Sequence, residues 1–263
     1  MRKYTVIYMA NLMSNLQYMA NIIINSLGFI VHIFIFFHVW NYIYENPAEL
    51  IYGFSKTQMV WYVTITEIIF CSVAGRRMVR TICNEVRSGN VAYNINKPYS
   101  YVGYIMFSNL GEVTIRLVFY VMIGLGLGIT FLGSIPTITI IEGIVIAISW
   151  ILSIIINMLF LTFIGLLAFI MEDSNPMYWL YSKMQLIFGI VFPLEFFPTA
   201  IQPIIKISPI FVTSYGPAKL FIDFNWRFAI IVILAQIAYL LISLGLCKLM
   251  YMKGVKKLNV NGG

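Results

Sequence analysis

Three ionisable residues inside long apolar stretches are the first candidates for chemistry. Glu67 interrupts the otherwise uncharged residues 58–75, and Glu112 and Arg116 lie four positions apart in a later apolar stretch. A charge inside a membrane is energetically costly, so it commonly marks a substrate path or a charge pair. We interpret Glu67 either as a residue that lines such a path or as a packed structural residue. Glu112 and Arg116 share one helix face and are expected to neutralise each other.

The two histidines, His32 and His38, are weak candidates for metal ligands. At six positions apart on a helix their side chains project to different sides, so the two cannot bind one metal ion. Packing or a position at the membrane interface is the favoured interpretation of both. The sequence also lacks the GxxxxGK[ST] loop and the HExxH motif, which are signatures of nucleotide binding and of zinc hydrolysis. We therefore expect a chain that is not an enzyme and that holds no metal or cofactor of its own.

Composition sets the class of protein that must position these residues. Of the 263 residues, 60% are hydrophobic and 10% are charged, whereas soluble domains carry about 25% charged residues. A soluble domain of this size could not cover so apolar a core. The composition therefore excludes a soluble enzyme, a disordered chain, a secreted disulfide scaffold and a nucleic-acid-binding domain. We predict an all-α integral membrane protein that forms a single domain over residues 1–263.

The apolar stretches predict six membrane-spanning helices, because each crossing needs about 20 apolar residues. The expected spans are about residues 20–44, 58–75, 109–132, 138–170, 177–193 and 228–250. In the third span, Gly124 and Gly128 have the GxxxG spacing of closely packed helices. Residues 1–19 combine apolar and polar side chains at helical spacing, which predicts a helix lying along the membrane surface. A signal peptide is the alternative for residues 1–19, but polar residues interrupt its expected apolar core.

Residues 194–226 have an unusual composition between the fifth and sixth spans. They are largely apolar, yet they contain four prolines and follow directly on a fifth. The five prolines are Pro193, Pro198, Pro203, Pro209 and Pro217. A helix cannot run unbroken through such spacing. We expect broken, re-entrant helical pieces that are buried against the rest of the protein, because unsatisfied backbone groups cannot face lipid.

The distribution of basic residues predicts the orientation. The formal net charge is +7, and most Lys and Arg residues lie near the two chain ends and in residues 76–100. Because Lys and Arg concentrate on the cytoplasmic side of membrane proteins, we expect both termini and residues 76–100 to be cytoplasmic. Residues 194–226 would then be extracellular.

A short amphipathic helix is predicted at the beginning of the cytoplasmic loop 76–100. Met78, Ile82 and neighbouring apolar residues share one face, and polar residues such as Arg80 and Asn84 cover the other. Gly89 marks the expected end of the helix. Such a helix either rests on anionic lipid or docks onto a soluble partner, and the pattern alone leaves both open.

Taken together, these features resemble a known family. A surface-lying first helix, six spans, a cytoplasmic helix between spans two and three and a proline-broken outer segment resemble the type-2 ATP-binding-cassette (ABC) export permeases. Three stretches resemble the bacterial branch that works beside a separate ATPase. They are RSGNVAYNINKPYS (87–100), LLAFIMED (166–173) and GIVFPLEFFP (189–198).

The resemblance implies a function and a set of partners. Two permeases, identical or paralogous, would carry two ABC ATPase subunits that bind ATP and Mg²⁺, in a bacterial cytoplasmic membrane and without nucleic acid. Glu67 would line the path between the permeases. The coupling surface that meets the ATPase would consist of Arg76, Arg77, Arg80, Glu85, Arg87 and Gly89. The outer gate would include Gly189, Pro193, Glu195 and Pro198.

The expected substrate is apolar or amphipathic, because the spans are rich in Ile, Phe and Met. Drugs, peptides and lipid-like molecules all remain open. Alternatives to an export permease are the substrate-binding membrane component of an importer, an integral membrane enzyme that modifies lipids and a non-transporting scaffold. An importer component would need a compact polar pocket, and a lipid-modifying enzyme would need clustered acidic or His residues.

Overall fold

The computed structural model describes residues 2–46, 50–95 and 97–261. Met1, residues 47–49, Asn96 and residues 262–263 lie outside the described residues, so the predicted segments 1–19 and 76–100 are described only in part. The helices are α1 (Arg2–Gln17), α2 (Met19–Ile43), α3 (Lys56–Ser72), α4 (Gly75–Arg87), α5 (Asn90–Ile95), α6 (Tyr101–Leu132), α7 (Ile140–Leu166), α8 (Ala168–Met171), α9 (Asn175–Gln185), α10 (Gln202–Ile207), α11 (Gly216–Ile222) and α12 (Trp226–Asn261). Between them lie two π-helical turns, η1 (Leu186–Val191) and η3 (Phe211–Tyr215), and one 3₁₀ turn, η2 (Leu194–Phe196).

Five helical stretches in the described part of the chain are long and apolar enough to cross a membrane. They are Ile22–Ile43, Lys56–Arg87, Tyr101–Leu132, Ile140–Met171 and Trp226–Lys256. The predicted fifth span, 177–193, corresponds to the 11 residues of α9 followed by the six of η1. That helical stretch is shorter than the about 20 residues that a crossing needs. The all-helical membrane class is confirmed, whereas six spans and the side of the two termini stay predictions.

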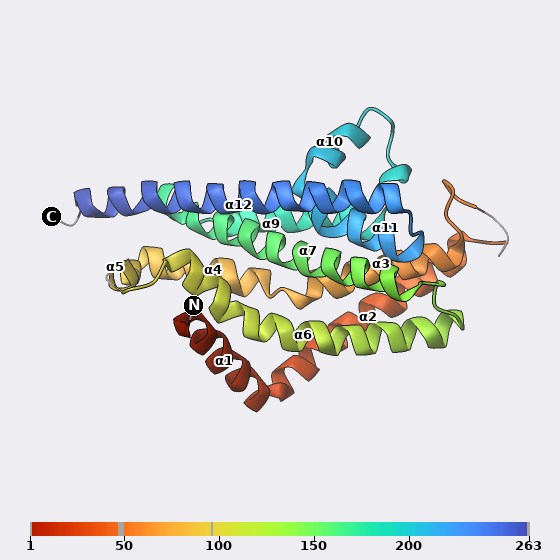
Figure 1. Cartoon of the computed structure of the whole chain (residues 1–263), viewed down its shortest axis with the longest axis horizontal. Helices are drawn as coiled ribbons and strands as arrows, with labels where there is room; N and C mark the ends of the chain where they lie inside the picture. The colour runs from red at the N-terminus through yellow and green to blue at the C-terminus, as the bar shows by residue number, and fades with distance from the viewer. Residues whose placement is uncertain (1, 47–49, 96, 262–263) are drawn as a thin grey trace.

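The long helices lie roughly side by side, and the elements predicted to be cytoplasmic gather at one end of the bundle. In Figure 1, α4, α5, the first turns of α1 and the C-terminal end of α12 lie toward the left. The connections from α2 to α3 and from α6 to α7 lie at the opposite end. The fold therefore places both chain ends and the predicted coupling helix on one side of the molecule.

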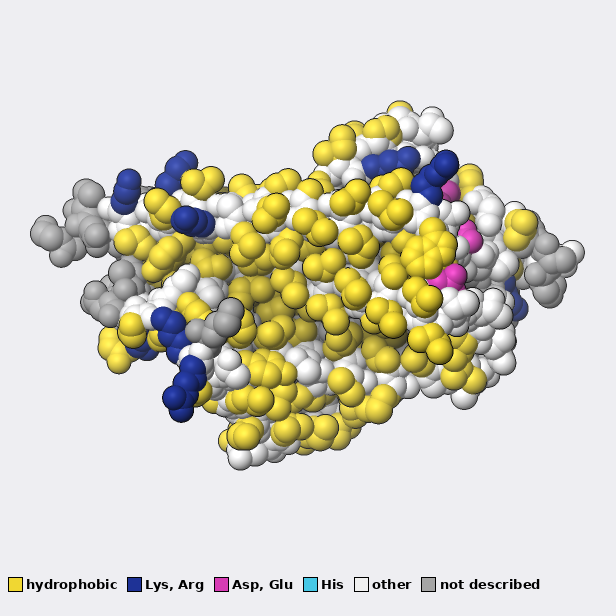
Figure 2. All heavy atoms as spheres, in the orientation of Figure 1, with side chains coloured by type: hydrophobic (Ala, Val, Ile, Leu, Met, Phe, Trp, Pro, Cys, Tyr) yellow, Lys and Arg dark blue, Asp and Glu magenta, His cyan; other side chains and the backbone are white. Residues whose placement is uncertain are grey.

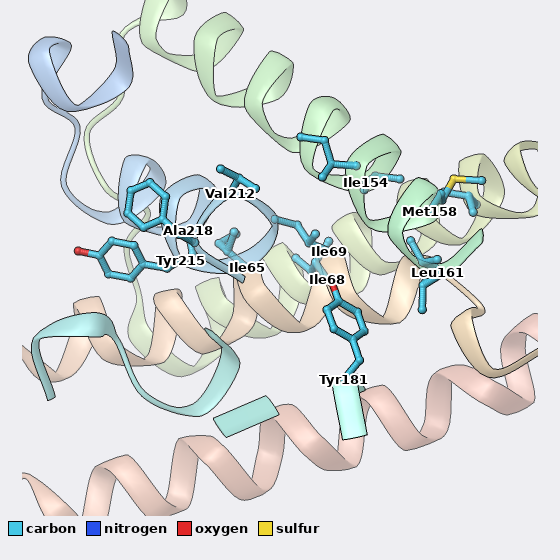
Figure 3. Close-up of a cluster of buried hydrophobic side chains, with 14 of the residues drawn as sticks. Ile65, Ile68, Ile69, Ile154, Met158, Leu161, Tyr181, Val212, Tyr215 and Ala218 are labelled. Carbon is cyan, nitrogen blue, oxygen red and sulfur yellow. The ribbon is translucent and has the colours of Figure 1, made fainter. Parts of the chain in front are cut away.

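The centre of the bundle is α3, whose residues from Met59 to Ile69 are all buried. Figure 3 shows Ile65, Ile68 and Ile69 of α3 among side chains from α7, α9, η3 and α11. A Cβ atom on Gly124 of α6 would come within 2.7 Å of Ile68, and one on Gly128 would overlap the indole ring of Trp61. The GxxxG spacing therefore has the predicted role of close helix packing.

Helix α6 begins at Tyr101, eight residues earlier than the predicted span 109–132. The reason is that no proline follows Pro98 until after Leu132, so nothing stops the helix at residue 109. The additional turns of α6, residues 101–108, pack against α1. The ring of Tyr4 on α1 stacks on Phe107 with 5.1 Å between the ring centroids. Thus α1 packs along the first half of α6. Whether it also lies on the membrane surface stays a prediction.

The predicted span 138–170 contains a break. A capping box between Thr139 and Glu142 starts α7, and the helix ends at Leu166, one residue before the short α8. The predicted broken pieces in residues 194–226 are present as η2, α10, η3 and α11, and prolines occupy the first turns of α10 and α11. Proline is tolerated there because the first helical N–H groups have no partner within the helix.

Candidate functional site

Glu67 is buried, with 1% of its surface exposed, at the end of α3 that faces the chain termini. Its Oε2 accepts a hydrogen bond from Sγ of Cys71 at 3.2 Å. Its Oε1 lies 3.7 Å from Nδ1 of His32 on α2, which makes a charge pair when the histidine is protonated. The side chain of His32 is about half exposed, so the pair links a buried acid to the outside of the bundle.

This pair lines a cavity of about 690 Å³, which we call the Glu67 cavity. Its walls come from α2, α3, α4 and α9. Besides His32 and Glu67, the lining includes Phe70, Arg76, Arg80, Asn84, Arg87, Asp173, Asn175, Tyr178, Trp179, Ser182, Lys183 and Leu186. A neighbouring cavity of about 600 Å³ shares five of these residues, including Arg76 and Arg80, and reaches Arg116 and Asn157. The two cavities therefore meet at the arginines of α4.

Glu112 is the centre of a cluster of charged and polar residues from three helices. It is 2% exposed, and its Oε1 lies 2.9 Å from Nε of Arg116, so the pair predicted from the i,i+4 spacing is present. Its other oxygen, Oε2, forms an ion pair with Arg77 of α4. The backbone N–H of Glu112 donates to the side-chain oxygen of Asn11 at 3.0 Å. The cluster therefore joins α1, α4 and α6.

The far end of α4 is fixed by three further contacts. Arg87 forms an ion pair with Asp173 at 3.2 Å and donates from Nε to the carbonyl of Glu172 at 2.8 Å. Amide groups of Asn175 donate to Oδ1 of Asp173, and these hydrogen bonds hold the pKa of that carboxyl below its usual value. The hydroxyl of Tyr101 donates to Oε2 of Glu85 at 2.7 Å.

The apolar face of α4 is covered by the chain itself. As the sequence predicts, the buried residues include Met78, Val79, Ile82 and Cys83. Ile82 packs so closely on Gly165 of α7 that a Cβ atom at Gly165 would come within 2.7 Å of it. Lipid is therefore not needed to cover this face. The exposed side carries Arg80, for which the described residues offer no ion-pair partner. Gly89 has a φ of 74°, which explains a glycine after the helix end.

Of the predicted outer-gate residues, Gly189 packs beside the middle of α3, next to Ile190, whose carbonyl accepts a hydrogen bond from the hydroxyl of Thr66 at 3.4 Å. The carbonyl of Gly189 accepts a hydrogen bond from the hydroxyl of Tyr62 at 2.7 Å, and a Cβ on Gly189 would come within 2.6 Å of Ile210. Glu195 accepts from the hydroxyl of Tyr215 at 2.7 Å and lies 4.0 Å from Nζ of Lys219.

Pro193 and Pro198 bracket the short turn η2. The predicted gate stretch 189–198 is thus packed against α3 and η3.

The sequence-predicted residues fall into three groups. Glu67 shares a cavity with Arg76, Arg80 and Arg87, Arg77 joins Glu112 and Arg116, and the outer-gate residues are separate from both. The sequence favours packing or an interfacial position for His32, and the structure adds this residue to the Glu67 group. Its position in the first apolar span was a signal, since a polar ring inside a span needs a partner. Nothing in the sequence signalled that Arg77 would reach Glu112.

The family model described as ABC-2 family transporter protein matches residues 29–262. No curated protein matches the chain. No solved structure matches it either. The match covers α3, α4, residues 194–226 and the charged residues of the Glu112 cluster, Arg77, Glu112 and Arg116.

Proposed function

The chain belongs to the ABC-2 transporter family, and on that premise we propose that it is the permease subunit of an exporter in a bacterial cytoplasmic membrane. Two permeases would form the path, and separate ATPase subunits would supply the energy by hydrolysing ATP with Mg²⁺. The proposed substrate is amphipathic. Membership of a transporter family favours a permease over the lipid-modifying enzyme that the sequence left open. That the permease exports its substrate, and does not import it, is part of the proposal.

The observation that carries the proposal is the anchoring of α4. The apolar side of the helix is buried against α7, Arg77 binds Glu112 on α6, and Arg87 binds the segment after α8. A push on the exposed side of α4 would therefore move α6 and α7 together. Closure of an ATPase dimer beneath the membrane is a source of such a push. We infer that α4 is the coupling helix and that Arg80 is its clearest contact residue.

The Glu67 cavity is the proposed inner part of the path. It combines arginines of α4 with aromatic side chains such as Phe70 and Trp179 and with one buried acid. Cations and apolar surface in one cavity favour a molecule with an apolar body and a polar or anionic group over a purely apolar one. This lining is the reason for proposing an amphipathic substrate.

Reversing the charge of Arg80 is expected to uncouple the ATPase from transport. Arg80 is exposed and makes no ion pair with a described residue, so we expect Arg80→Glu to leave the fold intact. Because Arg80 also lines the Glu67 cavity, retention of the ATPase is the readout that separates an effect on the partner from an effect on the path. Charge complementarity across an interface contributes to partner affinity. We expect about a tenfold weaker retention of the ATPase, together with loss of substrate-stimulated ATP hydrolysis. Both are measured on the purified complex.

The matched control is Lys253→Glu, which makes the same charge change on an exposed residue of α12. It should leave retention and coupling unchanged. Glu85→Arg is the complementary variant, because it adds positive charge and would strengthen attachment to anionic lipid. Glu85→Arg also removes the hydrogen bond that Glu85 accepts from Tyr101. Tyr101→Phe removes this hydrogen bond without changing the charge, so it is measured as the control. Normal coupling in both Arg80→Glu and Glu85→Arg would refute docking through this side of α4.

Glu67 is expected to matter more for transport than for folding. Glu67→Gln keeps the shape of the side chain and removes its charge, so the pair with His32 and the field in the cavity are lost. We expect substrate-stimulated ATP hydrolysis to fall about tenfold, as intramembrane acids are commonly functional, with the melting temperature nearly unchanged. His32→Gln should give a similar loss. If Glu67→Gln transports normally, Glu67 is a packing residue.

A further inference from the structure

A large apolar groove lies on the outside of the bundle, away from the Glu67 cavity. It has a volume of about 1030 Å³ and lies between α6, α7 and α12. Its walls include Met106 and Leu110 of α6, Leu159 of α7, and Leu240 and Leu244 of α12. Figure 2 shows this face as a hollowed band of hydrophobic side chains between α12 and α6. The residues named for the proposed transport path take no part in this groove.

One end of the groove is basic. Lys248 and Lys256 of α12 line it beside Tyr99 and Tyr251, and no acidic residue is among the described residues of its lining. Nζ of Lys97 lies 5.7 Å from the ring centre of Tyr99, which adds a further cation near this end. In Figure 2, the Lys and Arg side chains on this face gather mainly toward the side where both chain ends lie. The groove therefore has an apolar body and a cationic mouth.

We propose that this groove is a binding site for one anionic phospholipid of the leaflet on the side of the chain termini. Acyl chains would fill the apolar body, and the phosphate would lie between Lys248 and Lys256. Basic pockets between membrane helices near the cytoplasmic surface are known to hold anionic headgroups, and the volume is that of a site for a large ligand. The site does not depend on the proposed export function.

Charge complementarity distinguishes this occupant from others. A helix of a second copy or of another protein would cover the apolar body, but it would leave the two lysines without a counter-charge unless it brought acidic residues. A phospholipid with a zwitterionic headgroup would make the same apolar contacts, but its ammonium group offsets the charge of its phosphate, so it would gain less from the lysines. An anionic phospholipid satisfies both parts of the groove at once.

The test compares two lipids on the purified, delipidated full chain. Native mass spectrometry would measure the binding of phosphatidylglycerol and of phosphatidylcholine with identical acyl chains. A basic residue near an anionic lipid contributes roughly fivefold in affinity, so the double variant Lys248→Gln with Lys256→Gln should bind phosphatidylglycerol about 25-fold more weakly. Its binding of phosphatidylcholine, which carries no net charge, should weaken much less. The control, Lys206→Gln with Lys253→Gln, removes the same charge from exposed residues outside the groove and should behave as the unaltered chain.

A second pair of variants tests the groove itself without changing charge. Leu244→Trp places bulk inside the groove, whereas Leu249→Trp places it on an exposed position of the same helix outside the lining. We expect loss of phosphatidylglycerol binding for the first and no change for the second. Equal affinity for the two lipids, an unchanged affinity in the lysine double variant, or unchanged binding in Leu244→Trp would each overturn the proposal. A dimer that Leu244→Trp dissociates would assign the groove to a second copy instead.

Discussion

Replacing Glu112 with Ala is expected to destabilise the protein by about 3–5 kcal/mol, the usual result of removing one partner from a buried ion pair. Arg116 is only 13% exposed in its side chain and would keep its charge with no carboxylate beside it. Arg77 would lose the contact that fixes α4 to α6. The measurement is reversible unfolding of the purified chain in detergent.

Two further variants test the explanation. Asp223→Ala removes an exposed acid from its pair with the mostly buried Lys219, which keeps Glu195 at 4.0 Å. We expect the small loss that is usual for a partly exposed pair, about 0.2–1 kcal/mol. The double variant Glu112→Met with Arg116→Met removes both buried charges of the cluster and leaves only the half-exposed Arg77, so it should be less destabilised than Glu112→Ala. If Glu112→Ala is as stable as Asp223→Ala, the cluster does not fix α4 to α6.

Replacing Gly128 with Leu is also expected to lower the stability of the protein strongly. Any side chain at this position would overlap the buried ring of Trp61. Overpacking of this kind costs about 1–3 kcal/mol. Displacing Trp61 would also break the hydrogen bond of 3.1 Å from its Nε1 to the carbonyl of Ser134, which ties α3 to the loop before α7. Thermal unfolding of the purified chain measures the loss.

Gly126 supplies the control on the same helix. It is exposed, and a Cβ there would meet no atom within 4 Å. Gly126→Leu should therefore leave stability unchanged or raise it by up to about 1 kcal/mol, because Gly is a poor helix former. Equal melting temperatures for the Gly126 and Gly128 variants would show that α6 and α3 do not depend on this close approach.

Much of the fold was predictable because it depends on residues near one another in the chain. Long apolar stretches predicted most of the spans, and the prolines of residues 194–226 predicted broken pieces there. The amphipathic pattern of α4 predicted which of its side chains are buried. The 177–193 stretch shows the limit, because composition suggested a full span and the described helix is shorter and ends in a π-helical turn.

The sequence by itself determined the membrane class, the pair of Glu112 with Arg116 and the glycine face of α6, because helical spacing alone sets which residues lie together within one or two turns. Only the tertiary structure decided that Arg77 also binds Glu112, that His32 approaches Glu67 and that α7 covers the apolar side of α4. These contacts join residues far apart in the chain. They depend on how each helix is rotated about its axis and where it crosses its neighbours, and packing of the whole bundle fixes both.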